Sequence, residues 1–210
     1  MKQSLALLGR QPALGLAELE SLYGAEAITP VGRETALIDL HHSEVNFDRL
    51  GGSIKLAKVL TRIDSTAWSA VMKHLKTNLP DHLHYFPEGK LRLGFNVIGI
   101  KVGVSELNRS GLEIKKVIKQ AGRSVRVVPN TDQQLSSAQS LHNQTTGPTG
   151  LEFLVVRDGN SILLCQVTQV QDINAYAARD QKRPKRDARV GMLPPKLAQI
   201  IVNLAGTHTV

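Results

Sequence analysis

The sequence contains one cysteine, few aromatic residues and no long hydrophobic run. Because Cys165 stands alone, neither an internal disulfide nor a thiolate metal cluster can form. Aromatic residues make up only 4% of the chain, so we expect aliphatic cores. No apolar run approaches the roughly 20 residues of a transmembrane helix, and Arg10 interrupts the first apolar run too early for a signal peptide. We therefore expect a cytoplasmic protein with no membrane partner.

Motifs for metal, thiol or nucleotide chemistry are also missing from the sequence. His82 and His84 have no carboxylate or cysteine at a supporting spacing, so they are interpreted as two loop histidines. Cys165 alternates with Gln166 in an expected strand, which is typical of a small core residue. The glycines within residues 98–103 are too widely spaced for a phosphate-binding loop. The sequence thus predicts no metal site and no nucleophilic cysteine.

Positive charge, in contrast, is abundant and unevenly distributed. The formal net charge is +8. Residues 101–126 and 179–210 each carry a net charge of +5, whereas residues 1–100 carry +1 and residues 127–178 carry −3. Two concentrated basic blocks are the footprint expected of a polyanionic partner.

The hydrophobic pattern of residues 1–63 predicts the order β-α-β-β-α-β of a ferredoxin-like domain. Pro12 opens an expected helix that Gly24 ends, and a second, short helix is expected at 46–50, before Gly51-Gly52. The expected strands lie at 5–8, 27–29, 35–40 and 54–63.

Residues 64–170 predict a second, α/β domain. Asp64-Ser65 is expected to cap a helix whose apolar stripe runs from Trp68 to Leu79, and Pro80 is expected to end it. The other expected elements are a strand at 91–97, a helix at 111–121, a strand at 123–128, a short helix at 135–142 and a hairpin of 151–157 with 162–170. The fold class expected for the chain is therefore α+β.

The first basic block offers a candidate nucleic-acid surface on this second domain. Its lysines lie off the buried face of the expected helix at 111–121, and the next strand adds two arginines. Basic side chains on a rigid helix and strand would pair with phosphates and position RNA without reading its sequence. A solvated helix face without a partner is the alternative. The candidate RNA-binding residues are Lys101, Arg109, Lys115, Lys116, Lys119, Arg123 and Arg126.

The second basic block leads into an amphipathic helix. Residues 171–193 predict an irregular, basic linker, and a helix is expected from Pro194 until Gly206 ends it. Its apolar residues recur at the spacing of one helical face. They are Leu197, Ile200, Ile201 and Leu204. Because little chain remains to cover this face, we expect the helix to fray or to pack against a neighbouring molecule.

Two segments of this sequence resemble the THUMP-containing tRNA guanine methyltransferases, which modify the 2-amino group of guanosine with S-adenosylmethionine. The first segment lies near the start of the chain and the second, more specific one near its end. The matching residues are Leu8-Gly9-Arg10-Gln11-Pro12, Leu14 and Leu16-Ala17-Glu18-Leu19-Glu20, then Arg179-Asp180-Gln181, Arg183-Pro184, Arg186-Asp187 and Gly191-Met192-Leu193-Pro194-Pro195-Lys196-Leu197-Ala198-Gln199-Ile200.

The resemblance implies an arrangement of domains and a set of site residues. It implies an N-terminal ferredoxin-like domain at 1–63, a THUMP RNA-binding domain at 64–170 and a basic interdomain linker at 171–193. Residues 194–210 would be the first helix of a Rossmann-like methyltransferase domain that this chain lacks. The resemblance also places five residues in the linker and at the edge of the cofactor pocket. They are Arg183, Arg186, Pro194, Pro195 and Lys196.

The departures from that family define the function that we expect. The glycine-rich cofactor loop and the Asp/Asn-Pro-Pro-aromatic element are absent, so this chain alone is expected to bind no S-adenosylmethionine and to catalyse no methyl transfer. The leading hypothesis is the tRNA-binding portion of such an enzyme, which grips the acceptor end of tRNA. The alternatives are a subunit of a split methyltransferase that needs a separate catalytic chain, and an RNA-free scaffold. A thiouridine synthase is disfavoured, because the closing motif does not suit one.

Overall fold

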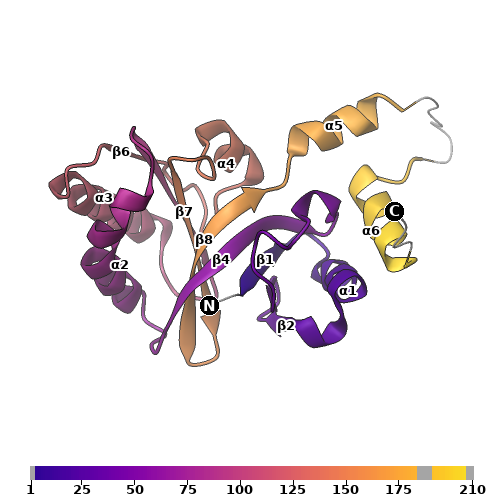
Figure 1. Ribbon diagram of the computed structural model, residues 1–210, viewed down its shortest axis with the longest axis horizontal. Helices are drawn as coiled ribbons and strands as arrows, with labels where there is room; N and C mark the ends of the chain where they lie inside the picture. The colour runs from indigo at the N-terminus through magenta and orange to yellow at the C-terminus, as the bar shows by residue number, and fades with distance from the viewer. Residues whose placement is uncertain (1–2, 184–190, 207–210) are drawn as a thin grey trace. The chain divides into compact units, whose positions relative to one another are not determined.

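The computed structural model describes residues 3–183 and 191–206 and shows an α+β fold (Figure 1). The chain divides into two compact units, which we call the terminal unit (Lys2–Leu56 with Gln171–Val210) and the central unit (Ala57–Val170). The chain passes from the first unit into the second within strand β4 (Ser53–Ile63). Within the described ranges, no helix combines the length and the hydrophobicity that crossing a membrane requires.

The terminal unit contains a sheet with the strand order β2-β3-β1-β4. Its first elements are β1 (Ser4–Leu8), α1 (Pro12–Tyr23), β2 (Ile28–Val31) and β3 (Thr35–Ile38). Every residue of β1 is buried, because this strand has a neighbour on each side and is packed in the core. The short helix expected at 46–50 is only a 3-10 turn, Phe47–Arg49, which buries the Phe47 ring.

A buried carboxylate, that of Glu18 on α1, connects three parts of the terminal unit. Its two oxygens accept hydrogen bonds from the backbone N–H groups of Gly51 (2.9 Å) and Gly52 (2.8 Å). The side-chain amide of Asn203 donates a third bond to the same carboxylate, at 2.7 Å. Because an ionised group is stable in a protein interior only when it is hydrogen-bonded, these three donors must stay in place.

Residues 171–182 are not the irregular linker that the sequence predicts. They contain helix α5 (Ile173–Gln181), and the Asp172 side chain caps it by accepting from the N–H groups of Asn174 and Ala175 at 2.9 and 3.0 Å. An aspartate that precedes a helical segment is a recognisable N-cap.

Helix α6 (Pro195–Leu204) is folded against the terminal unit, so the expectation that it frays is wrong. Ile200 and Asn203 are buried, whereas Ile201 is 47% and Leu204 is 39% exposed. The Asn203 amide also donates to the Arg49 carbonyl at 2.9 Å. The predicted apolar stripe is therefore rotated, because a polar side chain, Asn203, takes a buried position opposite Glu18.

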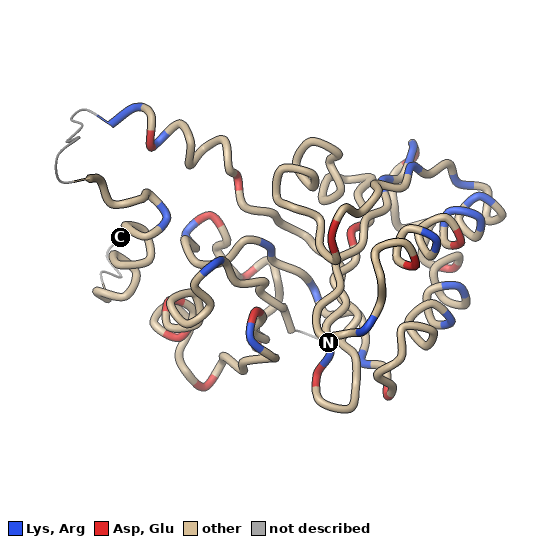
Figure 2. The backbone as a smooth tube through the Cα atoms, turned by 180° about the vertical axis from the view of Figure 1, so that it is seen from behind, with Lys and Arg blue, Asp and Glu red and all other residues tan. Residues whose placement is uncertain are grey.

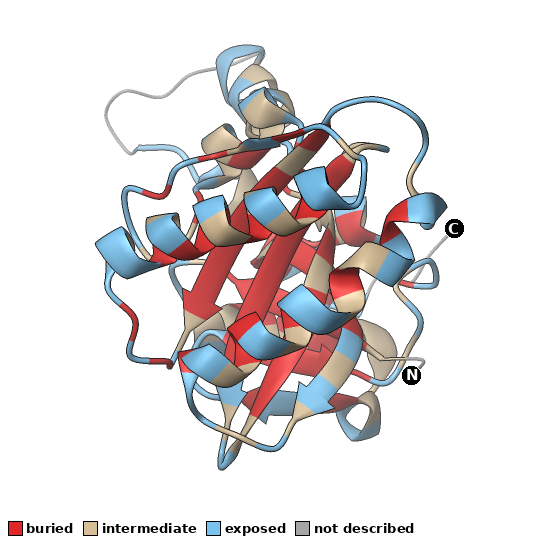
Figure 3. Cartoon of the chain, turned by 90° about the vertical axis from the view of Figure 1, so that its left-hand side faces the viewer, coloured by how far each residue is buried: buried red, intermediate tan, exposed pale blue. Residues whose placement is uncertain are grey.

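The central unit contains a mixed sheet with the order β4-β8-β7-β5-β6, covered on one face by helices α2 and α3 (Figure 3). The strand β5 pairs in parallel with both β6 and β7, and β7 pairs antiparallel with β8. The elements are α2 (Trp68–His82), β5 (Leu91–Ile98), α3 (Val104–Gln120), β6 (Val125–Val127), α4 (Ser137–Asn143), β7 (Gly150–Asp158) and β8 (Ser161–Val170). Figure 3 shows the inner sides of α2 and α3 buried against the strands and their outer sides exposed.

The ends of α2 differ from the sequence-based prediction. The N-cap residue is Ala67 without a side-chain cap, and Ser65 instead accepts from the Ala67 N–H at 3.1 Å. At the other end, Pro80 lies inside the helix, which continues to His82. Proline removes one N–H donor, crowds the carbonyl four residues earlier and disfavours a helical conformation for the residue before it, and α2 ends two residues after Pro80.

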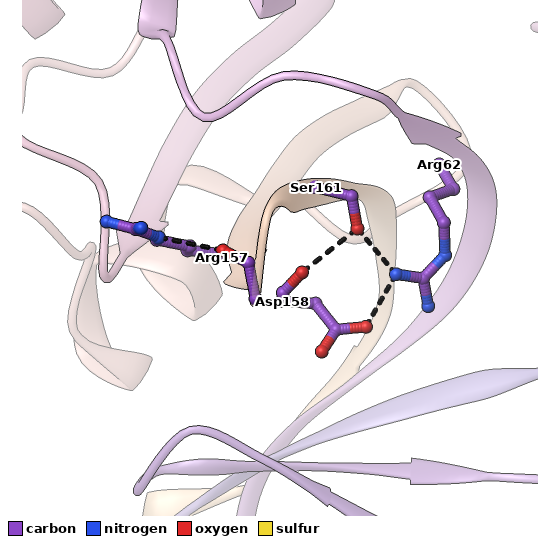
Figure 4. A network of polar contacts seen from close by, with 5 residues as sticks. Arg62, Arg157, Asp158 and Ser161 are labelled. Carbon is purple, nitrogen blue, oxygen red and sulfur yellow. Dashed lines mark hydrogen bonds and ion pairs between the residues drawn. The ribbon is translucent and has the colours of Figure 1, made fainter.

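The hairpin of β7 and β8 forms at the predicted Asp158-Gly159-Asn160 turn and is braced by an ion pair (Figure 4). One guanidinium nitrogen of Arg62, on β4, donates to a carboxylate oxygen of Asp158 and to the Ser161 hydroxyl, both at 2.6 Å. Arg157 donates to the Gly159 carbonyl at 3.0 Å. These arginines stabilise the turn.

The three hydrogen bonds to Glu18 predict a large loss of stability when its carboxylate is removed. The substitution Glu18→Ala leaves the backbone N–H groups of Gly51 and Gly52 and one of the two N–H groups of the Asn203 amide without acceptors, and each such group costs about 1–3 kcal/mol. We expect the free energy of unfolding, measured with urea, to fall by at least about 3 kcal/mol. The control Glu20→Ala, on the same helix, should stay within about 0.5 kcal/mol. Equal effects of the two substitutions would contradict this account.

Candidate nucleic-acid interface

Helix α3 presents a row of lysines on the surface of the central unit. Its buried residues, which include Leu107, Ile114 and Ile118, pack into the core below. Lys116 and Lys119 are exposed and Lys115 is half-buried. Residues three and four positions apart are neighbours on a helix surface, so Lys119 lies beside both Lys115 and Lys116. We call these three lysines the α3 lysine patch.

The α3 lysine patch is not neutralised by neighbouring carboxylates. In the part of the chain that the structure describes, none of its three lysines forms an ion pair. The nearby Glu113 is instead bound to Lys76 of α2 at 2.8 Å. That hydrogen bond is the main reason why the pKa of Glu113 lies below its usual value. The patch therefore keeps its positive charge available to an anion.

Strand β6 adds one basic residue, Arg126, but on a different face of the sheet. Gly111 of α3 lies so close to Val127 that an added Cβ would come within 2.9 Å of the valine side chain. Val127 therefore points toward α3, and its neighbour Arg126 points to the opposite face, since successive strand residues alternate. The register places Arg92 of β5 beside Arg126, so these two arginines form a second basic spot.

Two of the predicted RNA-binding arginines have partners within the protein. The Arg123 guanidinium donates to the carbonyls of Leu83 (2.9 Å), Phe86 (3.2 Å) and Pro87 (2.6 Å). Arg123 therefore fixes the position of the segment after α2, and few of its N–H donors remain for a phosphate. Arg109 is exposed and lies 3.9 Å from Glu106, at a groove between α2 and α3.

The seven predicted residues therefore do not converge on one surface. The structure brings Lys115, Lys116 and Lys119 together, and Lys101 is exposed in the loop just before α3. Arg126 lies on the other face of the sheet, and the Arg123 guanidinium is hydrogen-bonded to the segment after α2. Figure 2 shows basic residues recurring along α3 and the segment after it. Arg92 is not among the seven predicted residues, although its alternation with the buried Leu91 and Leu93 indicates a side chain that points away from the core.

The predicted linker residues have structural partners where they are described. Arg183 pairs with Asp180 at 2.8 Å and donates to the Leu193 carbonyl at 2.6 Å. Pro194 is the N-cap of α6, and Pro195 is its first residue. Arg186 lies outside the described residues.

Lys196 occupies a partly buried position at the start of α6. Its ammonium group donates to the side-chain carbonyl of Gln171 and lies 5.1 Å from the centre of the Tyr176 ring. The Arg179 guanidinium lies 5.0 Å from the same ring. Burial lowers the pKa of Lys196, because a desolvated ammonium is less stable than a hydrated one.

The surroundings of Lys196 do not fit S-adenosylmethionine. Dinucleotide and related folds use a glycine-rich loop at a helix N-terminus and an acidic residue that binds the ribose. The cavity next to Lys196 is lined by Arg10 and Lys196, and no Asp or Glu is among the described residues that line it. Two positive charges also disfavour a sulfonium cation. We therefore assign no cofactor chemistry to this cavity.

The cysteine and the loop histidines have the following surroundings. Cys165 is fully buried, and burial raises the pKa of its thiol far above the usual value. The His84 ring contacts the Tyr85 ring at a tilt of 41°, with ring centres 3.9 Å apart. Within the ranges that the structure describes, no three His, Cys, Asp or Glu side chains gather in a way that could hold a metal ion.

Comparison with known proteins supports the fold. No protein-family model matches the sequence, and no curated protein matches it. TrmN from Thermus thermophilus has a similar structure, with a TM-score of 0.51 and 19% identity over 98% of this chain and 55% of that chain.

Two more distant structures are PH1313 from Pyrococcus horikoshii OT3 and a 4-thiouridine synthetase crystallised with RNA and bound ATP. Their TM-scores are 0.47 and 0.45, with 8% and 12% identity. Each likeness covers 81% of this chain, and 55% and 42% of the respective neighbour. The chain thus spans about half the length of the structures that it matches, and it shares the fold of the matching part of TrmN.

The different surroundings of Arg123 and Lys116 predict opposite effects of substitution. Arg123→Ala removes the donor to three carbonyls, so we expect the free energy of unfolding to fall by about 1–3 kcal/mol. Lys116→Ala removes an exposed side chain without an ion pair and should change it by less than about 0.5 kcal/mol. Urea denaturation measures both values. A small effect of Arg123→Ala would contradict the structural role given to this arginine.

Proposed function

We propose that the chain is the tRNA-binding portion of a tRNA guanosine 2-amino methyltransferase, with the α3 lysine patch as part of the RNA contact. The observation that carries this proposal is the patch itself, Lys115, Lys116 and Lys119, which forms no ion pair in the described part of the protein. Three unpaired charges on a rigid helix are suited to phosphates, because they need no rearrangement before they bind.

The likeness to TrmN supports the same function. It extends over nearly the whole of this chain and about half of TrmN, as expected if this chain corresponds to one portion of a longer enzyme. Helix α3 contains no aromatic residue, which agrees with recognition through the backbone of the RNA, since sequence-specific RNA binding depends on stacking of unpaired bases. We expect the α3 lysine patch to contact the acceptor end of tRNA.

The affinity for tRNA should depend on salt and on the α3 lysine patch. Each phosphate contact contributes a slope of roughly −0.7 to −0.9 to a plot of log K against log salt concentration. The triple variant Lys115→Gln, Lys116→Gln, Lys119→Gln should therefore bind at least about ten-fold more weakly at low salt and show a shallower slope. Filter binding or fluorescence anisotropy measures both.

A matched control for this test is a variant that loses three positive charges elsewhere on the central unit. Lys58→Gln, Lys73→Gln and Lys90→Gln change the net charge equally but leave α3 intact. If this control weakened tRNA binding as much as the α3 variant, only net charge would matter and the patch would have no specific role. Equal affinity for tRNA with and without its unpaired 3′ nucleotides would rule out recognition of the acceptor end.

The alternative, a subunit of a split methyltransferase, draws support from the outer side of α6. Ile201 and Val202 are 47% and 54% exposed there. Under either hypothesis, the substitutions Ile201→Ser and Val202→Ser should leave the tRNA affinity unchanged. Loss of methyl transfer by a reconstituted pair of chains would favour the alternative, and unchanged transfer would exclude this surface as the contact.

A further inference from the structure

A second feature with no role in the proposed RNA contact is a cavity of about 430 Å³ within the terminal unit. Its wall includes the loop before α1, the backbone of Gly51 and Gly52, and the first turn of α6. Small-molecule sites have volumes of about 300–1,000 Å³. The space is therefore large enough for an organic ligand.

The wall of this cavity is mainly apolar. Leu14, Ile54 and Ile200 belong to it, and they come from α1, β4 and α6. The hydrogen bonds between Glu18, the two glycines and Asn203 fix these three elements against one another. A cavity whose walls are held in this way is preformed, so a ligand would not have to order it.

Among the described residues that line the cavity, the charged side chains are all positive. Arg10 is exposed and forms no ion pair or hydrogen bond with any described residue. Among the described residues, the Lys196 ammonium donates to one acceptor, the uncharged Gln171 side chain, and lies near the Tyr176 ring. The buried acid Glu18 is not among the residues that line the cavity, and its oxygens accept from Gly51, Gly52 and Asn203. Two cations at an apolar cavity are suited to an anion that has an apolar body.

We propose that this cavity binds an organic phosphate monoester of the nucleoside monophosphate class. The phosphate would lie between Arg10 and Lys196, and the nucleoside would pack on Leu14, Ile54 and Ile200. A guanidinium can bind two phosphate oxygens at once, and an anion would compensate the desolvated ammonium of Lys196. The same chemistry is offered by a free nucleotide and by a 5′-phosphorylated end of RNA.

Calorimetric titration of the whole chain with adenosine monophosphate at low salt tests this proposal. We expect saturable binding that is at least ten-fold weaker in Arg10→Gln and in Lys196→Gln. The control Arg33→Gln, an exposed arginine of the terminal unit outside the cavity, should bind as the unmodified chain does. Adenosine and inorganic phosphate should each bind at least ten-fold more weakly than the monophosphate, because each lacks one half of the ligand.

The source of the ligand is distinguished with short RNA oligonucleotides. Stronger binding of a 5′-phosphorylated than of a 5′-hydroxyl oligonucleotide, lost in Arg10→Gln, would assign the site to an RNA end. Preference for the free monophosphate would assign it to a nucleotide. The triple α3 variant should keep monophosphate binding, so failure of the two proposals can be told apart.

The proposal is overturned if neither adenosine monophosphate nor the 5′-phosphorylated oligonucleotide binds, or if the Arg10→Gln variant binds both of them as the unmodified chain does. It is also overturned if adenosine binds as tightly as its monophosphate. Lys196→Gln also loses the contact with Gln171, so its folding must be checked by circular dichroism. Arg10→Gln removes no described contact and keeps the test decisive.

Discussion

The fold of the terminal unit depends on the burial of one carboxylate, that of Glu18. A charge in the interior requires fixed donors, and here they come from the turn Gly51-Gly52 and from Asn203 on α6. Glycine is needed in the turn, because an added Cβ at Gly52 would collide with Gly15 of α1. Three segments that lie far apart in the sequence are thereby held together. The position of α6, and with it the wall of the cavity beside Lys196, follows from this interaction.

Much of the fold could be predicted from the sequence, because local patterns determine most of its elements. The Trp68–Leu79 stripe, the alternation from Leu91 to Val97 and the turn at Asp158-Gly159-Asn160 each predicted an element that the structure contains. The predictions that were wrong concern features that depend on contacts formed only in the folded protein or on a cap that was not considered. The orientation of α6 depends on a buried Asn203 that periodicity alone assigns to the surface. Helix α5 begins at the Asp172 N-cap, a local signal that the interpretation of this segment as a linker did not use.

The candidate site could be predicted only in part. Helical periodicity was sufficient to place Lys115, Lys116 and Lys119 together, since the buried positions of α3 leave them on the outer side. It could not show that the Arg123 donors are used by carbonyls some 35–40 positions earlier in the chain, a contact that exists only after folding. Nor could it show that Arg126 and Arg92 share a face, because this requires the parallel register of β5 with β6.

The central claim is that RNA contacts the α3 lysine patch, and chemical footprinting of lysines tests it most directly. The chain would be treated with an amine-reactive reagent in the presence and in the absence of tRNA, and the modified peptides quantified by mass spectrometry. Our account predicts that bound tRNA protects Lys115, Lys116 and Lys119 at least several-fold more than Lys58 and Lys73. Unchanged reactivity of the three α3 lysines under saturating tRNA would contradict it.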